Sequence, residues 1–146
     1  MALHATVVAR NFPIGWRAAL LRGPSGAGKS DLALRLMTRG WRLVADDYAE
    51  VWASSGALFA SAPERIAGRI EARGVGLITV PVRMLSRVVL IADCGPSAPE
   101  RLPHPAYEKL MSVTLPRLDL QALEASATAK LSAALDAVVR GDTLGA

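Results

Sequence analysis

The residues from Gly23 to Ser30 read GPSGAGKS, and they restrict the fold of this chain more than any other stretch. They match the pattern G-x-x-x-x-G-K-[ST], with an apolar run before them and apolar residues at helical spacing after them. Glycines let successive backbone N–H groups turn toward one point, where they form a concavity the size of an anion. The sequence therefore predicts a phosphate-binding loop between a strand and a helix, made of Gly23, Pro24, Ser25, Gly26, Ala27, Gly28, Lys29 and Ser30.

The chemistry of this loop predicts its ligands. The N-terminus of the following helix adds about half a positive charge at the point where the N–H groups converge. Lys29 can reach the outer phosphates of ATP, and the Ser30 hydroxyl can ligate Mg²⁺. The alternative interpretation is a glycine-rich turn with a surface lysine. The motif by itself names neither the reaction nor the phosphoryl acceptor.

Apolar runs separated by turn residues predict the remaining elements of the first hundred residues. We expect a hairpin from residues 5–9 and 18–21, a helix after Ser30 that ends at Gly40, and a second hairpin around Ser54–Gly56. A helical turn beginning at Pro63 should follow. Further strands are expected at 41–47, 77–80 and 87–93, and a surface loop at 95–105.

The last third of the chain predicts one long helix. Leucine, alanine and valine side chains repeat there at steps of three and four residues, at Leu120, Leu123, Ala127, Leu131, Leu135 and Val138. Asp119 is expected as the N-cap, and Leu118 with Leu123 as a hydrophobic staple. Together the elements predict an α/β fold: a P-loop kinase-like domain with a mixed β-sheet flanked by helices, a single domain over residues 1–146.

Two adjacent acids, Asp46 and Asp47, end the strand that follows the predicted loop and helix. The strands of a β-α-β unit run parallel, so their carboxyl ends meet at one edge of the sheet. We therefore expect both acids beside the phosphate loop, one near Mg²⁺ and the other able to take a proton from an attacking hydroxyl. The alternative is an ordinary polar strand end.

Composition restricts the partners and the compartment. The net charge of +4 suits either an anionic partner or an ordinary basic surface in solvent, and no block of consecutive Lys or Arg indicates a nucleic-acid tail. A single cysteine, Cys94, allows no internal disulfide and is expected to be buried and inert. No apolar segment is long enough to span a bilayer and the start lacks a signal peptide, so we predict a cytoplasmic protein without nucleic-acid or membrane partners.

Two stretches together resemble one family, HPr kinase/phosphorylase of the bacterial phosphotransferase system. They are GPSGAGKSDLALRLMTRGWRLVADD, from Gly23 to Asp47, and IEARGVGLI, from Ile70 to Ile78. The resemblance extends over residues 3 to about 92, with Ala5 in place of the glycine that follows the family's histidine. It implies a short form that consists of the catalytic domain and lacks the N-terminal domain of longer members.

The resemblance also implies an activity and residue roles. Such an enzyme transfers the γ-phosphate of ATP to a serine of the carrier protein HPr, and in reverse uses inorganic phosphate to release pyrophosphate. By position, Asp47 would be the general base, and His4 would hydrogen-bond near it. Asp46 and Ser30 would lie close to Mg²⁺, and Glu71 could join them. The family is typically hexameric, so assembly is an expectation as well.

Arginines in the second stretch supply a further candidate. Arg65, Arg69 and Arg73 would line one face if their segment were helical, and such a stripe could meet phosphate or an acidic carrier. A solvated face is the simpler interpretation of Arg65 and Arg69, whereas Arg73 is a candidate catalytic residue. Other functions remain open: a P-loop kinase of a small metabolite, a non-catalytic ATP-binding regulator, or a kinase of a paralogous carrier.

Overall fold

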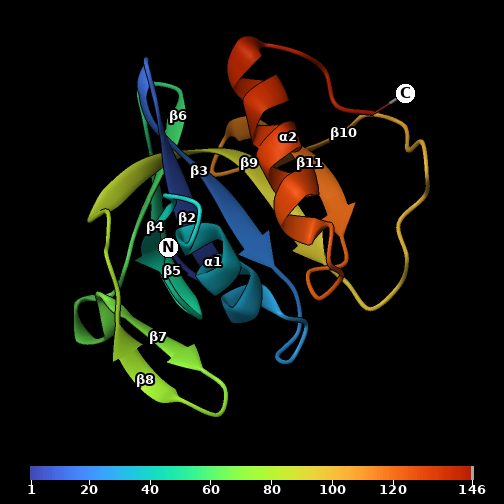
Figure 1. Cartoon of the computed structure of the whole chain (residues 1–146). Coiled ribbons are helices and arrows are strands. Elements are labelled where there is room, and N and C mark those ends of the chain that lie inside the picture. Colours follow the sequence, from blue (N-terminus) through green and yellow to red (C-terminus); the bar gives the residue numbers. More distant parts are fainter. Residues whose placement is uncertain (146) are drawn as a thin grey trace.

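The computed structural model describes residues 1–145, which form eleven strands, two α-helices and one short 3₁₀ helix (Figure 1). The strands are β1 (Ala2–His4), β2 (Thr6–Phe12), β3 (Gly15–Arg22), β4 (Arg42–Ala45), β5 (Tyr48–Ser54), β6 (Ala57–Ser61), β7 (Arg69–Ala72), β8 (Gly76–Thr79), β9 (Leu85–Cys94), β10 (Ala106–Leu110) and β11 (Val113–Leu120). The helices are α1 (Lys29–Met37), η1 (Glu64–Ile66) and α2 (Ala127–Arg140). Both predicted hairpins, the predicted helix after the loop and the strands at 77–80 and 87–93 are confirmed.

Nine strands form one mixed sheet in the order β1-β5-β6-β9-β3-β2-β4, with β11 and then β10 added to β9. β9 pairs in parallel with β3 and β11, and the other pairings are antiparallel. β2 lies between β3 and β4 and is antiparallel to both. The strands on either side of α1 therefore run in the same direction, as predicted, without pairing with each other. Their carboxyl ends still reach the same edge of the sheet.

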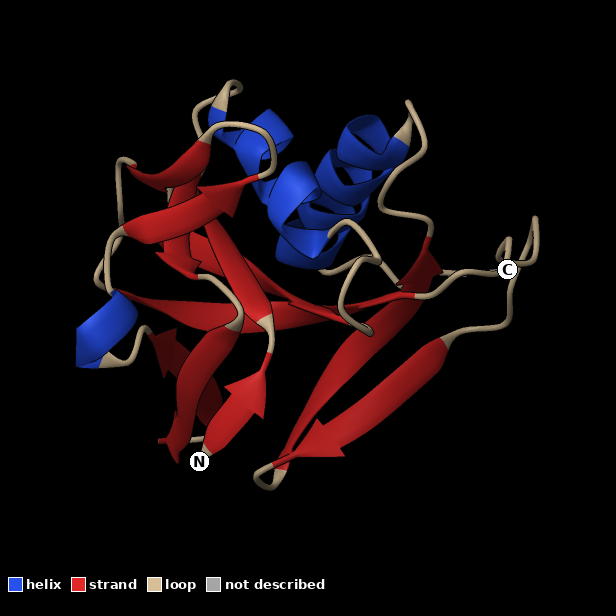
Figure 2. Cartoon of the chain, turned by 90° about the horizontal axis from the view of Figure 1, so that it is seen from below, coloured by secondary structure: helices blue, strands red, loops and turns tan. Residues whose placement is uncertain are grey.

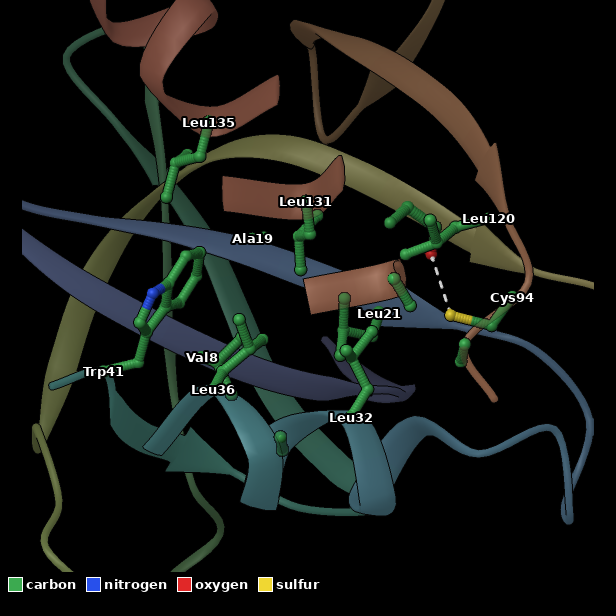
Figure 3. Close-up of a cluster of buried hydrophobic side chains, with 14 of the residues drawn as sticks. Val8, Ala19, Leu21, Leu32, Leu36, Trp41, Cys94, Leu120, Leu131 and Leu135 are labelled. Atoms are coloured by element: carbon green, nitrogen blue, oxygen red, sulfur yellow. Dashed lines mark hydrogen bonds between the residues drawn. The ribbon is translucent and has the colours of Figure 1, made fainter. Parts of the chain in front are cut away.

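The sheet separates two clusters of buried side chains. One packs α1 and α2 onto the same face, where Val8, Leu21, Leu32, Leu36 and Leu131 meet (Figure 3). Figure 2 shows both helices on that side of the strands. On the other face the curved sheet packs against itself, with side chains from β2, β3, β5, β6 and β11. Alternate residues of β2 and β3 point to opposite clusters, as expected for strands buried on both faces.

The start of the last helix was predicted wrongly. Leu118, Asp119 and Leu120 belong to β11, and α2 begins at Ala127 after Ser126. Asp119 is therefore no N-cap, and Leu118 and Leu123 form no staple at a helix start. The spacing of the leucines misled because Leu118 and Leu120 also fit the alternation of a strand. The strands β10 and β11 were not predicted.

The hypothesis that Arg65, Arg69 and Arg73 line one face of a helix was wrong as well. Arg65 lies in η1, while Arg69 begins β7 and Arg73 follows it, so these three side chains share no helical face. β7 and β8 form a separate two-stranded hairpin, seen at the lower left of Figure 1, which is anchored by the buried Ile70. Among the described residues, no helix has the length and apolar character needed to cross a membrane.

Candidate active site

The predicted phosphate-binding loop connects β3 to α1, and two of its glycines, Gly23 and Gly28, occupy positions that a larger residue would strain. Gly23 has a φ of 147°, and a Cβ there would lie 2.3 Å from the carbonyl oxygen of Cys94 at the end of β9. Gly28 is the N-cap of α1 with a φ of 98°, a left-handed conformation that glycine adopts without strain. The first turn of α1 leaves backbone N–H groups without intrahelical acceptors at this point. The loop therefore has the backbone of an anion-binding site.

Lys29 closes the loop on itself. Its buried Nζ donates hydrogen bonds to the carbonyl oxygens of Gly23 (2.6 Å) and Pro24 (3.1 Å). An ammonium group has three donors, so Lys29 stabilises the loop through two of them and keeps a positive charge next to its carbonyl oxygens. Lys29 therefore places a positive charge within the loop that an anion would enter.

Asp46 meets the loop at its last residue. Ser30 Oγ donates a 2.6 Å hydrogen bond to Asp46 Oδ1, although the two residues come from separate elements. Asp46 is buried, and a second hydroxyl, from Thr6 on β2, donates to the same oxygen at 3.0 Å. The prediction that Asp46 lies beside the loop is therefore confirmed.

Asp46 and Ser30 have the donor chemistry that Mg²⁺ requires. Mg²⁺ prefers oxygen ligands and is commonly bound through one or two carboxylates together with substrate phosphates. Glu71 contacts Asp46 through its backbone N–H, which lies 3.4 Å from Asp46 Oδ2, and its side chain is exposed. Between residues 1 and 145 no group of three or more His, Cys, Asp or Glu side chains forms a closed metal site. The oxygen atoms of Ser30 and Asp46 could contribute to a magnesium site that the phosphates of a nucleotide complete.

Asp47 lies next in the chain but faces a different partner. Its Oδ1 is 2.9 Å from His4 Nε2, and because a carboxylate only accepts hydrogen bonds, Nε2 carries the hydrogen. His4 is held by the pairing of β1 with β5, opposite Tyr48, whose ring centroid lies 5.5 Å from that of His4. Asp47 has a φ of 68° and a side chain that is 61% exposed. A non-glycine residue in this strained conformation, with an accessible carboxylate, is a common feature of functional sites.

Thr6 connects the two acids and was missed by the sequence analysis. Its buried hydroxyl donates to Asp46 and accepts a 3.3 Å hydrogen bond from the backbone N–H of Asp47. The neighbouring Ala5 N–H donates to the carbonyl oxygen of Asp47 at 2.9 Å. A lone threonine at the start of an apolar strand carries no motif. Its position two residues after the candidate His4 was the only available signal.

Arg73 approaches the loop from the hairpin of β7 and β8. A Cβ built on Gly26 would lie 3.9 Å from Arg73 Nη2, which places the guanidinium beside the loop. Arg73 is exposed, so its positive charge is accessible to an anion there. Of the three candidate arginines, Arg65, Arg69 and Arg73, it is Arg73 that lies beside the loop.

A group of ion pairs that the sequence analysis missed supports the loop from the other side. Arg22, which precedes Gly23, binds Asp93 and Glu108 with two hydrogen bonds each, and Arg117 also binds Asp93. Burial raises the pKa of Asp93, but the hydrogen bonds from Arg22 and Arg117 outweigh it and hold this pKa below its usual value. The hydrogen bond from Arg22 likewise lowers the pKa of Glu108. Next to this group, burial raises the pKa of the Cys94 thiol to about 11, in agreement with an inert cysteine.

The mixed sheet and the loop between β3 and α1 define a P-loop domain of the kinase type. The solved HPr(Ser) kinase/phosphatase of Coxiella burnetii has the same fold, with a TM-score of 0.76 at 24% identity over 97% of this chain and 95% of that one. The family model of the HPr Serine kinase C-terminal domain matches residues 3–85. The chain belongs to this family.

Relatives by sequence agree with this assignment. The HPr kinase/phosphorylase of Clostridium tetani is 48% identical over 77 residues, which are 52% of this chain and 25% of that protein. The HPr kinase/phosphorylase of Brevibacillus brevis is 39% identical over 99 residues, or 62% of this chain and 30% of that protein. The matched part thus spans between a quarter and a third of these relatives.

Proposed function

We propose that this protein transfers the γ-phosphate of ATP to a serine of an HPr-type phosphocarrier protein and runs the phosphate-dependent reversal. One observation carries the proposal: Asp46 contacts the last residue of the phosphate loop, while the adjacent Asp47 presents an accessible carboxylate held by His4. Membership in the HPr serine kinase family and the names of the relatives supply the acceptor.

In the forward direction, Asp47 acts as the general base. The serine Oγ of the carrier attacks the γ-phosphorus, its proton passes to the Asp47 carboxylate, and the bond to the β,γ-bridging oxygen breaks to release ADP. The exposure of Asp47 lets a protein substrate reach it, which a buried carboxylate would not allow. His4 is a positioning residue that orients Asp47 through the 2.9 Å hydrogen bond.

ATP and Mg²⁺ are the proposed cofactors. The backbone N–H groups of the loop and Lys29 would hold the phosphates, and Ser30 with Asp46 would hold the metal, with Glu71 close by. Bound Mg²⁺ neutralises the negative charge of the phosphates. Arg73, beside Gly26, would supply a further positive charge at the phosphate loop.

In the reverse direction the same carboxyl acts as the acid. An oxygen of inorganic phosphate attacks the phosphorus of the phosphoserine, and the bond from phosphorus to the serine Oγ breaks. Protonated Asp47 donates its proton to the leaving serine oxygen, and pyrophosphate is formed. The two directions share one site because the proton returns by the path on which it left.

Incubation with Mg²⁺, ATP and a purified HPr-type carrier, followed by intact mass spectrometry, tests the proposal. We expect the carrier to gain one phosphoryl group, and added inorganic phosphate to remove it with release of pyrophosphate. A carrier lacking the acceptor serine should stay unmodified. A panel of small hydroxyl-bearing metabolites serves as the alternative acceptor, and phosphorylation of one of these with none on the carrier would refute the proposal.

The role of Asp47 has its own test. Asp47→Asn should lower turnover by about 10²–10⁴-fold while ATP affinity is retained, because the amide cannot accept the serine proton. Asp142→Asn is the matched control. Asp142 is an exposed carboxylate that pairs with Arg140, and it lies far from Asp47 in the sequence. Near-normal turnover of Asp47→Asn would show that another group is the base.

Assembly and location follow the same family expectation. We propose a cytoplasmic enzyme that assembles as a hexamer, and size-exclusion chromatography with light scattering measures the number of subunits directly. A monomer at working concentration would contradict the hexamer while leaving the chemistry unaffected.

A further inference from the structure

A hollow of about 330 Å³ lies beside the phosphate loop. Its walls come from three separate segments: residues 24–27 of the loop, residues 95–96 after β9, and residues 121–123 between β11 and α2. Figure 1 shows the orange connection from β11 to α2 beside the light-blue loop that follows β3. Two of these three segments lie beyond the residues that the family model matches.

The strand order places this hollow opposite the candidate catalytic groups. Four neighbouring strands of the sheet lie in the spatial order β9-β3-β2-β4. The phosphate loop leaves the end of β3, so β9 lies on one side of it and β2, followed by β4, lies on the other. Asp46 and Asp47 follow β4, whereas Gly95 and Pro96 follow β9. A triphosphate whose last phosphate faces the acids therefore directs its other end toward the hollow.

The chemistry of the walls suits an uncharged group. None of the nine lining residues, all within the described part of the chain, carries a charged side chain. Pro96 and Leu123 offer apolar surfaces, and the amide of Gln121 can both donate and accept hydrogen bonds. Gln121 Nε2 now donates to the Pro96 carbonyl oxygen at 3.5 Å, a long bond that a ligand can replace.

Leu123 is the most informative of these residues. Its side chain is 64% exposed, although it reaches Gly28 closely enough that a Cβ there would lie 2.6 Å from Leu123 Cδ2. Arg35 of α1 holds this segment by donating hydrogen bonds to the carbonyl oxygens of Ala122 and Glu124. A large apolar side chain is thus held firmly at the mouth of an anion-binding loop, where the flat face of a base would cover it.

We infer that this hollow binds the nucleoside of the phosphoryl donor, with Pro96 and Leu123 as apolar contacts of the base and Gln121 as its hydrogen-bonding partner. The inference rests on the proposed function, because it takes a nucleoside triphosphate as the ligand of the loop. It assigns selection of the nucleotide to the part of the chain beyond residue 85.

Binding of ATP and of inorganic tripolyphosphate to the full chain, both with Mg²⁺, tests the inference by calorimetry. Tripolyphosphate fills the loop but has no nucleoside, so the wild type should bind ATP about tenfold more tightly or better. Leu123→Ser should weaken ATP binding about tenfold and change tripolyphosphate binding less than about twofold. Gln121→Ala should change the preference for ATP over GTP without affecting tripolyphosphate.

Leu102→Ser is the matched control, because Leu102 is 69% exposed and does not line this hollow. Thermal unfolding of each variant verifies that it is folded. If Leu123→Ser weakens both ligands equally, or neither, the inference is wrong while the proposed function stands. If the wild type binds neither ligand, the proposed function and the inference are both wrong.

Discussion

Residues 3–85 and residues 86–145 contribute to the candidate site in different ways. The first region matches the family model and carries the phosphate loop, both acids, His4 and Arg73. The second region supplies no predicted catalytic group, yet it contains all but the first residue of β9 at the centre of the sheet, and α2 over the core. The carbonyl oxygen of Cys94 leaves no room for a side chain at Gly23, and the side chain of Leu123 leaves none at Gly28.

The comparison separates chemistry from support. Reactive groups in the first region are read from short motifs, because a motif records the residue types that a reaction needs. The supporting contacts of the second region depend on shape, and many sequences can provide the same shape. Substitutions of the candidate catalytic groups in the first region should therefore reduce turnover in a folded protein, and substitutions of buried residues in the second region should reduce stability.

Lys29→Ala should have the largest effect. Removal of the ammonium takes away the charge that would face the phosphates, and we expect turnover to fall at least about a thousandfold. The carrier phosphorylation assay measures this loss, and circular dichroism verifies the fold. Lys109→Ala, a change of an exposed lysine in the second region, should leave turnover unchanged. Equal losses in the two variants would remove the distinction between the regions.

Leu131→Ala should show the opposite behaviour. Leu131 of α2 is fully buried between the helices and the sheet, and its truncation should lower the free energy of unfolding by about 3 kcal/mol. Urea denaturation measures this change, and turnover per folded molecule should stay close to that of the wild type. Leu102→Ala is an exposed control with little expected effect. A large loss of turnover in folded Leu131→Ala would mean that α2 acts on the chemistry.

The same division explains how much was predictable from the sequence. The phosphate loop, its flanking elements and the position of Asp46 beside the loop followed from a motif and a rule about parallel strands, whereas only the family resemblance placed Ser30 and Asp46 near one metal. That rule held although β2 lies between β3 and β4, because both strands are antiparallel to β2. The contact between His4 and Asp47 was an implication of the family resemblance, and their catalytic roles remain predictions.

Other features had no readable signal. Thr6 is one threonine among apolar residues, and only the fold brings its hydroxyl to both acids. The ion pairs of Arg22 join residues 71 and 86 positions apart, which no local pattern records. The false start of the last helix shows that leucine spacing cannot by itself separate a strand and turn from a helix.

Gly23→Ala tests the contact between the two regions. The new Cβ would overlap the Cys94 carbonyl oxygen, so either the loop or the end of β9 must move. We expect a loss of about 2 kcal/mol in the free energy of unfolding together with weaker ATP binding. Gly56→Ala is the matched control, because Gly56 has a φ of 78° but open space around it. This variant should lose about 1 kcal/mol in the free energy of unfolding. If the two variants were equally stable and bound ATP equally, β9 would not constrain the loop.

Arg22→Met should have the smallest effect, and its size should depend on pH. Asp93 and Glu108 have pKa values held below their usual range by Arg22, so their ion pairs stabilise the native state above the pKa of the unfolded chain. This stabilisation is lost as the pH falls through the lower native values, below about pH 4. We expect the variant to lose about 1 kcal/mol at pH 7, because the pairs are partly exposed to solvent.

Urea denaturation of wild type and Arg22→Met at pH 7 and at about pH 3 measures this dependence. The difference in unfolding free energy should narrow at the lower pH, where the carboxyl groups become protonated and no longer pair with Arg22. Arg140→Met, which breaks the exposed pair with Asp142, should show almost no difference at either pH. A difference for Arg22→Met that stayed constant with pH would mean that packing of the arginine side chain, and not its charge, supports the loop.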